Sequence, residues 1–463
     1  MGNEKDHLEA IEGKEKFRFI GTSPIRPDGV DKVTGRANFG ADFTANGMIH
    51  GRVVRSPHAH AKIKSINIEK ALKMKGVKAI VTGQDFPKID PSDKVVGEVV
   101  VSFYDMSQNV IARDKVFYDG HAVAAVAATS IKIAEEAATL IEVEYEVLPA
   151  VMTVIDAMKK NAPVLHKGMK TEGMDPVPKR SSNVASRAEL KLGNAAEAFK
   201  DADVIVERDY TAQTVHQGYI EPHACVAEVS ADGMATIWSS SQGQFMVRAF
   251  VAKLCAMNAS KIKVIPSEIG GGFGGKTKVY LEPLALLLSR QSGRPVKMVM
   301  TREEVLRATG PTSGGHARAK IGAKKDGTLV AAELEMEYEA GAFAGSPVKL
   351  GCMTGFAPYN LKHVSCIGWD VVVNRPQAAA YRAPGAPVAA FAVESAMDEL
   401  ADTLGIDPLE LRIKNAAVEG TQAPYGVKFP KIGCLETLRQ AKATEHYNIC
   451  LLYTSPSPRD GLL

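Results

Sequence analysis

The sequence lacks the features of a membrane, secreted or nucleic-acid-binding protein. Its longest apolar runs, residues 122–128 and 284–288, fall far short of the roughly 20 residues that a transmembrane helix needs. The 56 Lys and Arg residues are scattered and nearly balanced by 53 Asp and Glu, so the net charge is only +3. The first residues are charged and show no apolar stretch of an export signal. We therefore expect a cytoplasmic globular protein with neither a membrane nor a nucleic-acid partner.

Cysteine is also scarce and dispersed. The six cysteines are Cys225, Cys255, Cys352, Cys366, Cys434 and Cys450. No two of them have the Cys-x-x-Cys spacing that commonly holds zinc or an iron-sulfur cluster. We therefore expect a reducing compartment and no iron-sulfur cluster or other cysteine-held metal in this chain.

Hydrophobic periodicity and turn residues divide the chain into segments of an α+β protein. We expect an N-terminal arm over 1–30, a mixed unit over 31–150, a linker over 151–185 and a larger mixed unit over 186–417. The expected elements are strands at 77–82, 141–147 and 262–265, helices at 133–140, 246–257 and 388–403, a hairpin of 316–323 with 328–338, and a helix opened by Asp407. The unit over 31–150 has its own strand and helix pattern, so we expect it to fold alone.

Residues 270–277, Gly-Gly-Gly-Phe-Gly-Gly-Lys-Thr, are the most informative local feature. Five glycines in six residues let the backbone approach a ligand closely and present several N–H groups to it. The segment fits both the phosphate-loop pattern G-x-x-x-x-G-K-[ST] and the dinucleotide pattern G-x-G-x-x-G.

The surrounding sequence supports neither nucleotide pattern. No apolar strand ending in a magnesium-binding Asp follows the loop. A dinucleotide-binding fold would have a second strand that ends in an acidic residue about 20 residues after the loop. Residues 283–292, which occupy this position, have a helical pattern instead. A tight turn that allows close helix packing is a third interpretation. A phosphate-loop nucleotide-binding enzyme stays an alternative.

Two further turns of small residues precede expected helices. They are residues 238–244, Trp-Ser-Ser-Ser-Gln-Gly-Gln, and residues 381–387, Tyr-Arg-Ala-Pro-Gly-Ala-Pro. Backbone N–H groups at such helix starts favour anions. Three such turns in one domain suit a large phosphate-bearing cofactor, with Gln242 and Arg382 as side-chain donors, although ordinary capping turns have the same composition.

Several motifs resemble, in order, the molybdopterin-binding large subunit of the xanthine dehydrogenase and aldehyde oxidase family of molybdenum hydroxylases. They are residues 26–42, residues 55–61 (Arg-Ser-Pro-His-Ala-His-Ala), residues 216–223 with Glu221-Pro222, the glycine loop, residues 382–385, residues 397–401 and residues 412–415. Each motif is weak alone, but their order from about residue 20 to residue 420 makes the combination specific.

The resemblance implies an α/β hammerhead domain followed by the first molybdopterin-binding domain, with a molybdenum-molybdopterin cofactor that includes the cytosine dinucleotide among its candidate forms. In the family, the glutamine at the position of Gln242 hydrogen-bonds a metal oxo group, and backbone at Phe273, Gly274 and Arg382 lines the metal and pterin. The cofactor-binding residues implied are Gln242, Gly271, Gly272, Phe273, Gly274, Gly275 and Arg382. Gln242, Phe273 and Arg382 are the ones implied to lie at the metal.

The resemblance also implies hydroxylation of an electron-poor carbon with water as the oxygen source. Purine-oxidising relatives place charged anchors at the positions that we align with Thr277 and Leu350, and an aromatic residue at that of Pro384. These three substrate-pocket positions favour an aldehyde, an aromatic N-heterocycle or an aryl thioester over xanthine. The absence of Cys after Tyr381-Arg382 disfavours carbon monoxide.

Further expectations concern partners and the end of the chain. The family passes electrons through iron-sulfur clusters to a flavin, so we expect separate iron-sulfur and flavin subunits and, at full length, a dimer of heterotrimers. The general-base glutamate lies in the second molybdopterin-binding domain, which residues 418–447 only begin. Residues 448–463 look like a non-native tail, so we expect this chain to be an inactive part of a longer subunit.

The histidines are expected to be structural. His58 and His60 alternate on an extended segment, and in the family this motif packs rather than catalyses. His223 follows Glu221-Pro222 near the expected cofactor face, where packing is favoured over metal binding.

Overall fold

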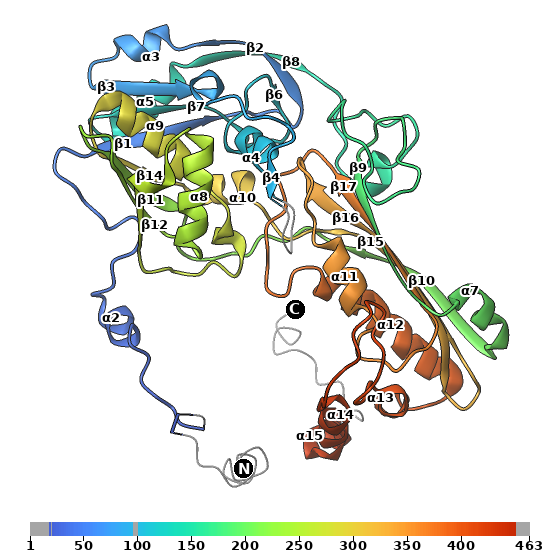
Figure 1. Ribbon diagram of the computed structural model, residues 1–463. Coiled ribbons are helices and arrows are strands. Elements are labelled where there is room, and N and C mark those ends of the chain that lie inside the picture. Colours follow the sequence, from blue (N-terminus) through green and yellow to red (C-terminus); the bar gives the residue numbers. More distant parts are fainter. Residues whose placement is uncertain (1–17, 20, 96–100, 451–463) are drawn as a thin grey trace, which may run out of the picture.

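A computed structural model describes residues 18–19, 21–95 and 101–450 (Figure 1). Most of the expected N-terminal arm and residues 451–463 of the expected non-native tail lie outside the described residues. None of the described helices combines the length and hydropathy needed to cross a membrane. The mixture of helices and mixed sheets confirms the α+β class.

A seven-stranded sheet forms the upper part of the molecule in Figure 1. Its strands, in spatial order, are β13 (Ile262–Pro266), β12 (Ala235–Ser239), β11 (Ala224–Val229), β14 (Val296–Val299), β1 (Ile49–Arg55), β7 (Ala122–Ala128) and β3 (Val77–Thr82). The strands β1 and β14 pair in parallel, with Ile49 opposite Val296. Strands from both expected units therefore share one sheet, which argues against independent folding of residues 31–150.

Helices cover both faces of this sheet. The helices α8 (Gln244–Leu254) and α9 (Glu282–Ser292) lie on one face, and α3 (Glu69–Lys73) and α5 (Ile131–Thr139) lie on the other. Every residue of β7 is buried, because both faces of the strand are covered. This burial explains why its sequence is continuously apolar instead of alternating.

A second sheet of five strands forms the lower right part of Figure 1. Its order is β10 (Val204–Ala212), β15 (Gly315–Ala323), β16 (Leu329–Gly341), β17 (Val364–Val372) and β9 (Val184–Leu192). The helices α11 (Val348–Thr354) and α12 (Ala386–Leu404) pack on one face of this sheet. They contact the apolar residues that occupy alternate positions along the strands. The side chain of Asp407 accepts hydrogen bonds from the N–H groups of Leu409 and Glu410, which begins α13 (Pro408–Asn415) as expected.

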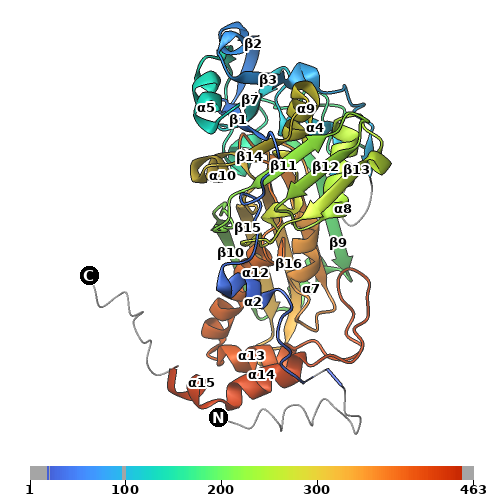
Figure 2. The same cartoon turned by 90° about the vertical axis from the view of Figure 1, so that its left-hand side faces the viewer.

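Smaller elements complete the fold. They are α2 (Gly29–Thr34), β2 (Ala61–Asn67), β4 (Lys94–Val95), β5 (Val101–Ser102), α4 (Phe103–Val110), β6 (Lys115–Val116), β8 (Glu142–Val147), α6 (Val154–Ala157), α7 (Ala195–Ala198), α10 (Arg302–Ala308), α14 (Cys434–Ala443) and α15 (Glu445–Cys450). The short segments η1 (Gly83–Asp85), η2 (Phe199–Asp201), η3 (Ala259–Lys261) and η4 (Gly275–Thr277) are 3-10 turns. In Figure 2 the helix α2 lies below the seven-stranded sheet, at the level of α12, and the chain runs upward from it toward that sheet.

The segment over 151–185, expected to be a linker, is packed against both units. Val151, Val154 and Leu165 are buried in one cluster with Phe117 and Phe343. The side chain of Asn374 joins the units further, because its amide nitrogen donates to the carbonyl oxygens of Ala59 and Phe117. The two units therefore meet across a packed interface.

Candidate functional site

Three turns that are far apart in sequence meet at one place. The turn before α8 contacts the glycine loop, because Gln242 donates its backbone N–H to the carbonyl oxygen of Lys276 at 3.0 Å. The turn before α12 contacts the same loop, because Arg382 donates its backbone N–H to Phe273 at 3.0 Å. The structure therefore brings together the turns that the sequence analysis singled out.

Close approach of backbone segments requires glycine in this loop. A Cβ atom added to Gly272 would lie 2.6 Å from Oε1 of Gln242, and one added to Gly274 would lie 2.6 Å from the carbonyl oxygen of Ala380. Three non-glycine residues at the junction have positive φ, which side chains rarely adopt: Phe273 (51°), Arg382 (22°) and Ala383 (59°). Such backbone strain concentrates at binding sites.

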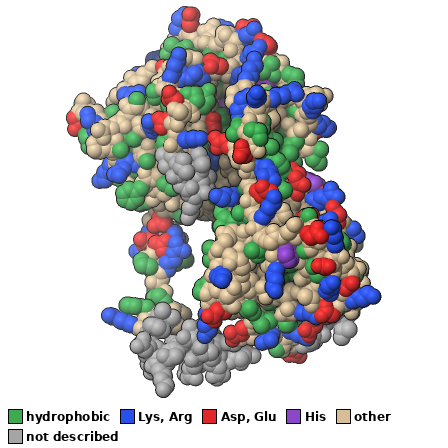
Figure 3. All heavy atoms as spheres, turned by 45° about the vertical axis from the view of Figure 1, so that its right-hand side comes forward, with side chains coloured by type: hydrophobic (Ala, Val, Ile, Leu, Met, Phe, Trp, Pro, Cys, Tyr) green, Lys and Arg blue, Asp and Glu red, His purple; other side chains and the backbone are tan. Residues whose placement is uncertain are grey.

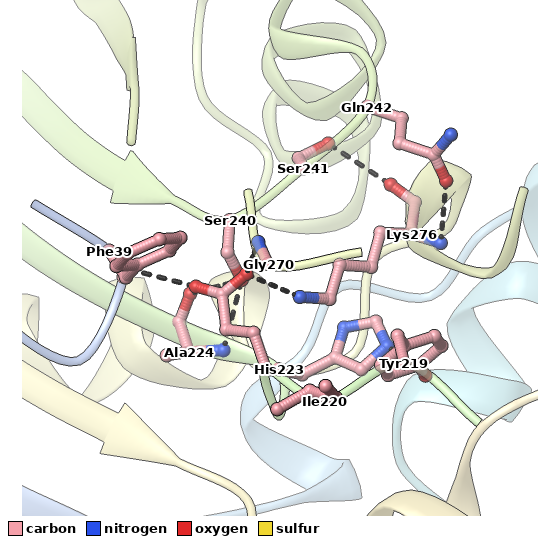
Figure 4. A network of polar contacts seen from close by, with 12 residues as sticks. Phe39, Tyr219, Ile220, His223, Ala224, Ser240, Ser241, Gln242, Gly270 and Lys276 are labelled. Carbon is pink, nitrogen blue, oxygen red and sulfur yellow. Dashed lines mark hydrogen bonds and ion pairs between the residues drawn. The ribbon is translucent and has the colours of Figure 1, made fainter. Parts of the chain in front are cut away.

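The side-chain amide of Gln242 has a fixed orientation. Its Oε1 accepts a hydrogen bond from the backbone N–H of Gly274 at 2.9 Å. It accepts a second one from the backbone N–H of Lys276 at 3.1 Å, as Figure 4 shows. Because both neighbours can only donate, Oε1 has to face them and Nε2 has to point away. Nε2 has no partner among the described residues. Gln242 therefore offers an unused amide donor beside the loop.

The loop offers further donors. The backbone N–H groups of Gly271, Gly272 and Phe273 donate to no other described residue. Arg382 is exposed, and its side chain forms no ion pair with another described residue. The side chain of Phe273 is 55% exposed at the same junction. This arrangement of backbone N–H, amide and guanidinium donors suits a ligand rich in hydrogen-bond acceptors.

The lysine of the glycine loop is buried and paired. Nζ of Lys276 lies 2.6 Å from Oε2 of Glu221, and the two side chains are 0% and 9% exposed. Burial lowers the pKa of Lys276, while Glu221 counteracts the shift. This lysine cannot reach a phosphate in the loop, and the loop leads into η4 and extended residues before α9 begins at Glu282. The geometry therefore does not fit the phosphate-loop alternative.

Sequence reasoning missed the partner of this lysine. In the sequence, Glu221 stands out only as part of a family motif beside Pro222 and His223. No local pattern joins Glu221 to Lys276, although a lysine that ends a glycine-rich loop needs a counterion if the loop is buried.

The histidines have structural partners. His223 is buried, its Nε2 lies 2.8 Å from the hydroxyl of Tyr219, and burial lowers its pKa to about 3. His60 is also buried, with Nδ1 2.7 Å from the carbonyl oxygen of Pro149. Across the described ranges, no three His, Cys, Asp or Glu side chains gather into a metal-binding group. The expected packing role of His60 and His223 agrees with these contacts.

The three expected substrate-pocket residues border the junction. Thr277 ends η4 and donates its hydroxyl to the carbonyl oxygen of Gly274 at 2.8 Å. Leu350 lies beside Gly385, since a Cβ added to Gly385 would come within 3.2 Å of the Leu350 Cβ. Pro384 precedes Gly385 and is half-buried. Leu350 and Pro384 thus lie at the turn before α12, and Thr277 lies at the end of the glycine loop that contacts it.

Other surface features lie away from this junction. A cavity of about 580 Å³ is lined by residues such as Lys261, Arg290 and Met257, none of which belongs to the three turns. Figure 3 shows Lys and Arg side chains interspersed with Asp and Glu across the face that it presents. This mixture agrees with the absence of a basic cluster in the sequence.

Two family models match the chain. The aldehyde oxidase and xanthine dehydrogenase a/b hammerhead domain matches residues 34–149. The molybdopterin cofactor-binding domain matches residues 177–416, which include all three turns.

Curated relatives cover most of the chain. It is 35% identical over 396 residues to a probable xanthine dehydrogenase subunit of Bacillus subtilis, a match that covers 85% of this chain and 50% of that relative. It is 32% identical over 437 residues to the nicotinate dehydrogenase large molybdopterin subunit of Eubacterium barkeri, covering 93% of this chain and 97% of that relative. The chain therefore spans half of one relative and nearly all of the other.

Solved structures agree with this assignment. Quinoline 2-oxidoreductase from Pseudomonas putida 86 superposes with a TM-score of 0.84 at 28% identity, covering 94% of this chain and 55% of that one. Aldehyde oxidoreductase from Desulfovibrio gigas superposes with a TM-score of 0.81 at 29% identity, covering 94% and 49%. The chain belongs to the xanthine dehydrogenase and aldehyde oxidase family and carries its hammerhead and molybdopterin cofactor-binding domains.

Proposed function

We propose that this chain supplies one side of the molybdenum-molybdopterin site of a hydroxylase that oxidises a small molecule. The observation that carries the proposal is the outward-facing Nε2 of Gln242, beside the unpartnered N–H groups of Gly271, Gly272 and Phe273. Oxo, phosphate and pterin groups present many acceptors, so a cluster of donors fits them. Arg382 adds a positive charge at the same junction.

In this proposal, each residue has a distinct task. Gln242 would donate its amide N–H to an oxo group of the metal centre, and the backbone at Phe273, Gly274 and Arg382 would line the cofactor. Gly271, Gly272 and Gly275 let the loop approach without a side chain in the way. When bound, the cofactor activates water as the nucleophile and accepts two electrons from the substrate. The cytosine dinucleotide form of the pterin belongs to this proposal as a candidate form.

The substrate in this proposal is an aldehyde, an aromatic N-heterocycle or an aryl thioester. Thr277, Leu350 and Pro384 present neither a charged anchor nor an aromatic ring at the positions where purine-oxidising relatives carry them. A purine bound there would leave polar groups unpaired, at a cost of about 1–3 kcal/mol each. Among the relatives, the names nicotinate dehydrogenase and quinoline 2-oxidoreductase refer to aromatic N-heterocycles.

A second molybdopterin-binding half completes the site in this proposal. It would supply the general-base glutamate and cover the apolar side chains exposed around the three turns. Those side chains are Ile220, Phe245, Met246 and Phe273. Electrons would leave through separate iron-sulfur and flavin subunits. Without the second half, the chain is expected to be inactive and to retain little cofactor.

The test compares two proteins. One is residues 1–447 alone. The other, the completed protein, contains the same residues together with the second molybdopterin-binding half, either fused to them or co-expressed. Bound molybdenum, extracted pterin and dye-linked oxidation of aldehydes and N-heterocycles are measured for both. We expect the cofactor and turnover only with the second half, and co-purification of iron-sulfur and flavin subunits. A completed protein that contains neither molybdenum nor pterin would overturn the proposed function. Equal cofactor content in both forms would overturn the need for the second half.

A further inference from the structure

The ion pair of Lys276 and Glu221 lies behind the glycine loop instead of facing the ligand side. Figure 4 shows the Lys276 side chain turned toward Gly270 and away from Gln242, whose side chain lies on the other side of the Lys276 backbone. The ammonium also lies 5.1 Å from the ring centroid of Tyr219, which is 1% exposed. The pair is therefore withdrawn from solvent on the inner side of the site.

One carboxylate oxygen joins the two ends of the loop. Oε2 of Glu221 accepts the backbone N–H of Gly270 at 2.8 Å and the ammonium of Lys276 at 2.6 Å. The backbone N–H of Glu221 donates in turn to the carbonyl oxygen of Gly270 at 3.1 Å. Gly270 has to be glycine, since an added Cβ would lie 2.5 Å from the Cβ of Glu221. The first and last residues of the segment 270–276 thus share a single anchor.

The same carboxylate also reaches the N-terminal segment. Oε1 of Glu221 accepts the backbone N–H of Gly40 at 3.0 Å. The neighbouring residue Phe39 forms a parallel bridge with Glu268, just before the loop. The Glu221 carboxylate therefore connects the glycine loop to Gly40, in the segment that leads into the hammerhead unit.

The loop between these ends has a high entropic cost of ordering. Gly270, Gly271, Gly272, Gly274 and Gly275 give it more backbone freedom than other residues would. Fixing both ends on one buried oxygen removes part of this freedom before a ligand binds. The N–H groups of Gly271, Gly272 and Phe273 then remain in place without spending binding energy on loop closure.

We propose that Glu221 and Lys276 are positioning residues that close the glycine loop into its ligand-binding shape in the cofactor-free chain. This inference rests on the proposed function for the identity of the ligand. It goes further in assigning the closure of the loop to a buried ion pair that does not touch the ligand. The loop should consequently be ordered before the cofactor arrives.

The first test is amide hydrogen exchange of the cofactor-free chain, unchanged and with Lys276→Met. Methionine is unbranched like lysine and only one atom shorter, and it removes the charge. We expect the amides of Gly270, Gly274 and Lys276 to exchange at least about tenfold faster, with α9 and β11 unchanged. Arg55→Met is the matched control, since Arg55 forms a half-buried pair with Glu304 at 2.9 Å, outside the glycine loop. Unchanged loop exchange in Lys276→Met, or an equal increase in α9 and β11, would overturn the proposal.

The second test is the double variant Lys276→Met with Glu221→Gln, which leaves no uncompensated charge. We expect its thermal midpoint to recover relative to Lys276→Met while loop exchange stays fast. Slow loop exchange in the double variant would show that the pair only neutralises a buried charge, which contradicts loop closure. If Lys276→Met does not fold, Glu221→Gln alone provides the same comparison of loop exchange.

A third measurement separates this inference from the proposed function. Pterin content is determined in the completed protein, with the second half present, for the unchanged chain and for Lys276→Met. Loss of pterin in the variant together with fast loop exchange supports loop closure. Pterin at the unchanged level despite a fast-exchanging loop would overturn it. Absence of pterin from the unchanged protein contradicts the proposed function and leaves the exchange result for loop closure standing.

Discussion

Arg382 donates its backbone N–H to the carbonyl oxygen of Phe273 at 3.0 Å, and both residues have a positive φ. The two strained turns therefore hold each other, although more than a hundred residues of chain separate them. A side chain that disturbs either turn should affect both. This coupling makes the junction sensitive to small changes in the glycine loop.

Gly274→Ala should lower the free energy of unfolding more than the same substitution at Gly233. The new Cβ would lie 2.6 Å from the carbonyl oxygen of Ala380, at a φ of 103°. We expect a loss of about 2–4 kcal/mol from backbone strain and displacement of the turn before α12. Gly233→Ala is the control, because its φ of 79° is also positive but nothing lies within 4 Å of an added Cβ. Urea unfolding of both variants provides the comparison, and equal losses would contradict the close-contact argument.

Gln242→Leu should release the glycine loop and remove a cofactor donor. The backbone N–H groups of Gly274 and Lys276 would lose their acceptor, at a cost of about 1–3 kcal/mol for each group that stays buried. We expect a lower free energy of unfolding and little bound molybdenum in the completed protein. Gln244→Leu serves as the control, since Gln244 donates to Ser241 within its own turn. Normal metal content in Gln242→Leu would exclude the proposed role of its amide.

The completed enzyme should oxidise an aldehyde or N-heterocycle far better than xanthine. Two unpaired polar groups of xanthine would cost about 1–3 kcal/mol each, which reduces kcat/KM by roughly 30-fold or more. Introducing the missing anchors with Thr277→Glu and Leu350→Arg should raise kcat/KM for xanthine relative to the aldehyde. Steady-state kinetics on both substrates measure this shift. Efficient turnover of xanthine without these changes would refute the specificity argument.

Acid should destabilise the hammerhead unit through His121. Nδ1 of His121 accepts the N–H of Phe117 at 3.2 Å, and Nε2 lies 2.7 Å from the carbonyl oxygen of Gln108, so the bonding requires the neutral ring. Burial lowers the pKa of His121 to about 4 from an ordinary value of about 6.5. Between these values the unfolded chain binds a proton that the folded chain does not, so stability falls as the pH drops.

The expected slope is up to about 1.4 kcal/mol per pH unit between about pH 6.5 and pH 4. Urea unfolding across this range measures it. His121→Gln lacks the titrating ring, so its stability at pH 7 should be lower but its slope shallower. A variant slope equal to that of the unchanged chain would rule out His121 as the source.

Local patterns were sufficient to predict many elements. The β-branched run over 77–82 forms β3 with the expected bounds, and Asp407 caps α13 because its side chain and the following Pro408 favour a helix start. The turn composition also identified the three segments that meet at the site. In each case the determining interactions lie within a few residues of one another.

Long-range pairings could not be predicted in this way. No local pattern indicates that Ile49 pairs with Val296, or that Glu221 is the counterion of Lys276. The segment over 151–185 has no hydrophobic period, yet its isolated apolar residues Val151 and Leu165 are buried because both units supply a surface for them. Such contacts depend on the assembled fold.

The parallel pairing of β1 with β14 limits how this protein can be divided. A fragment that ends near residue 150 would contain β1, β7 and β3 but would leave one edge of β1 without its partner strand. An uncovered edge strand tends to pair with other chains. A hammerhead unit taken from a relative would therefore have to present an edge of β1 that fits β14.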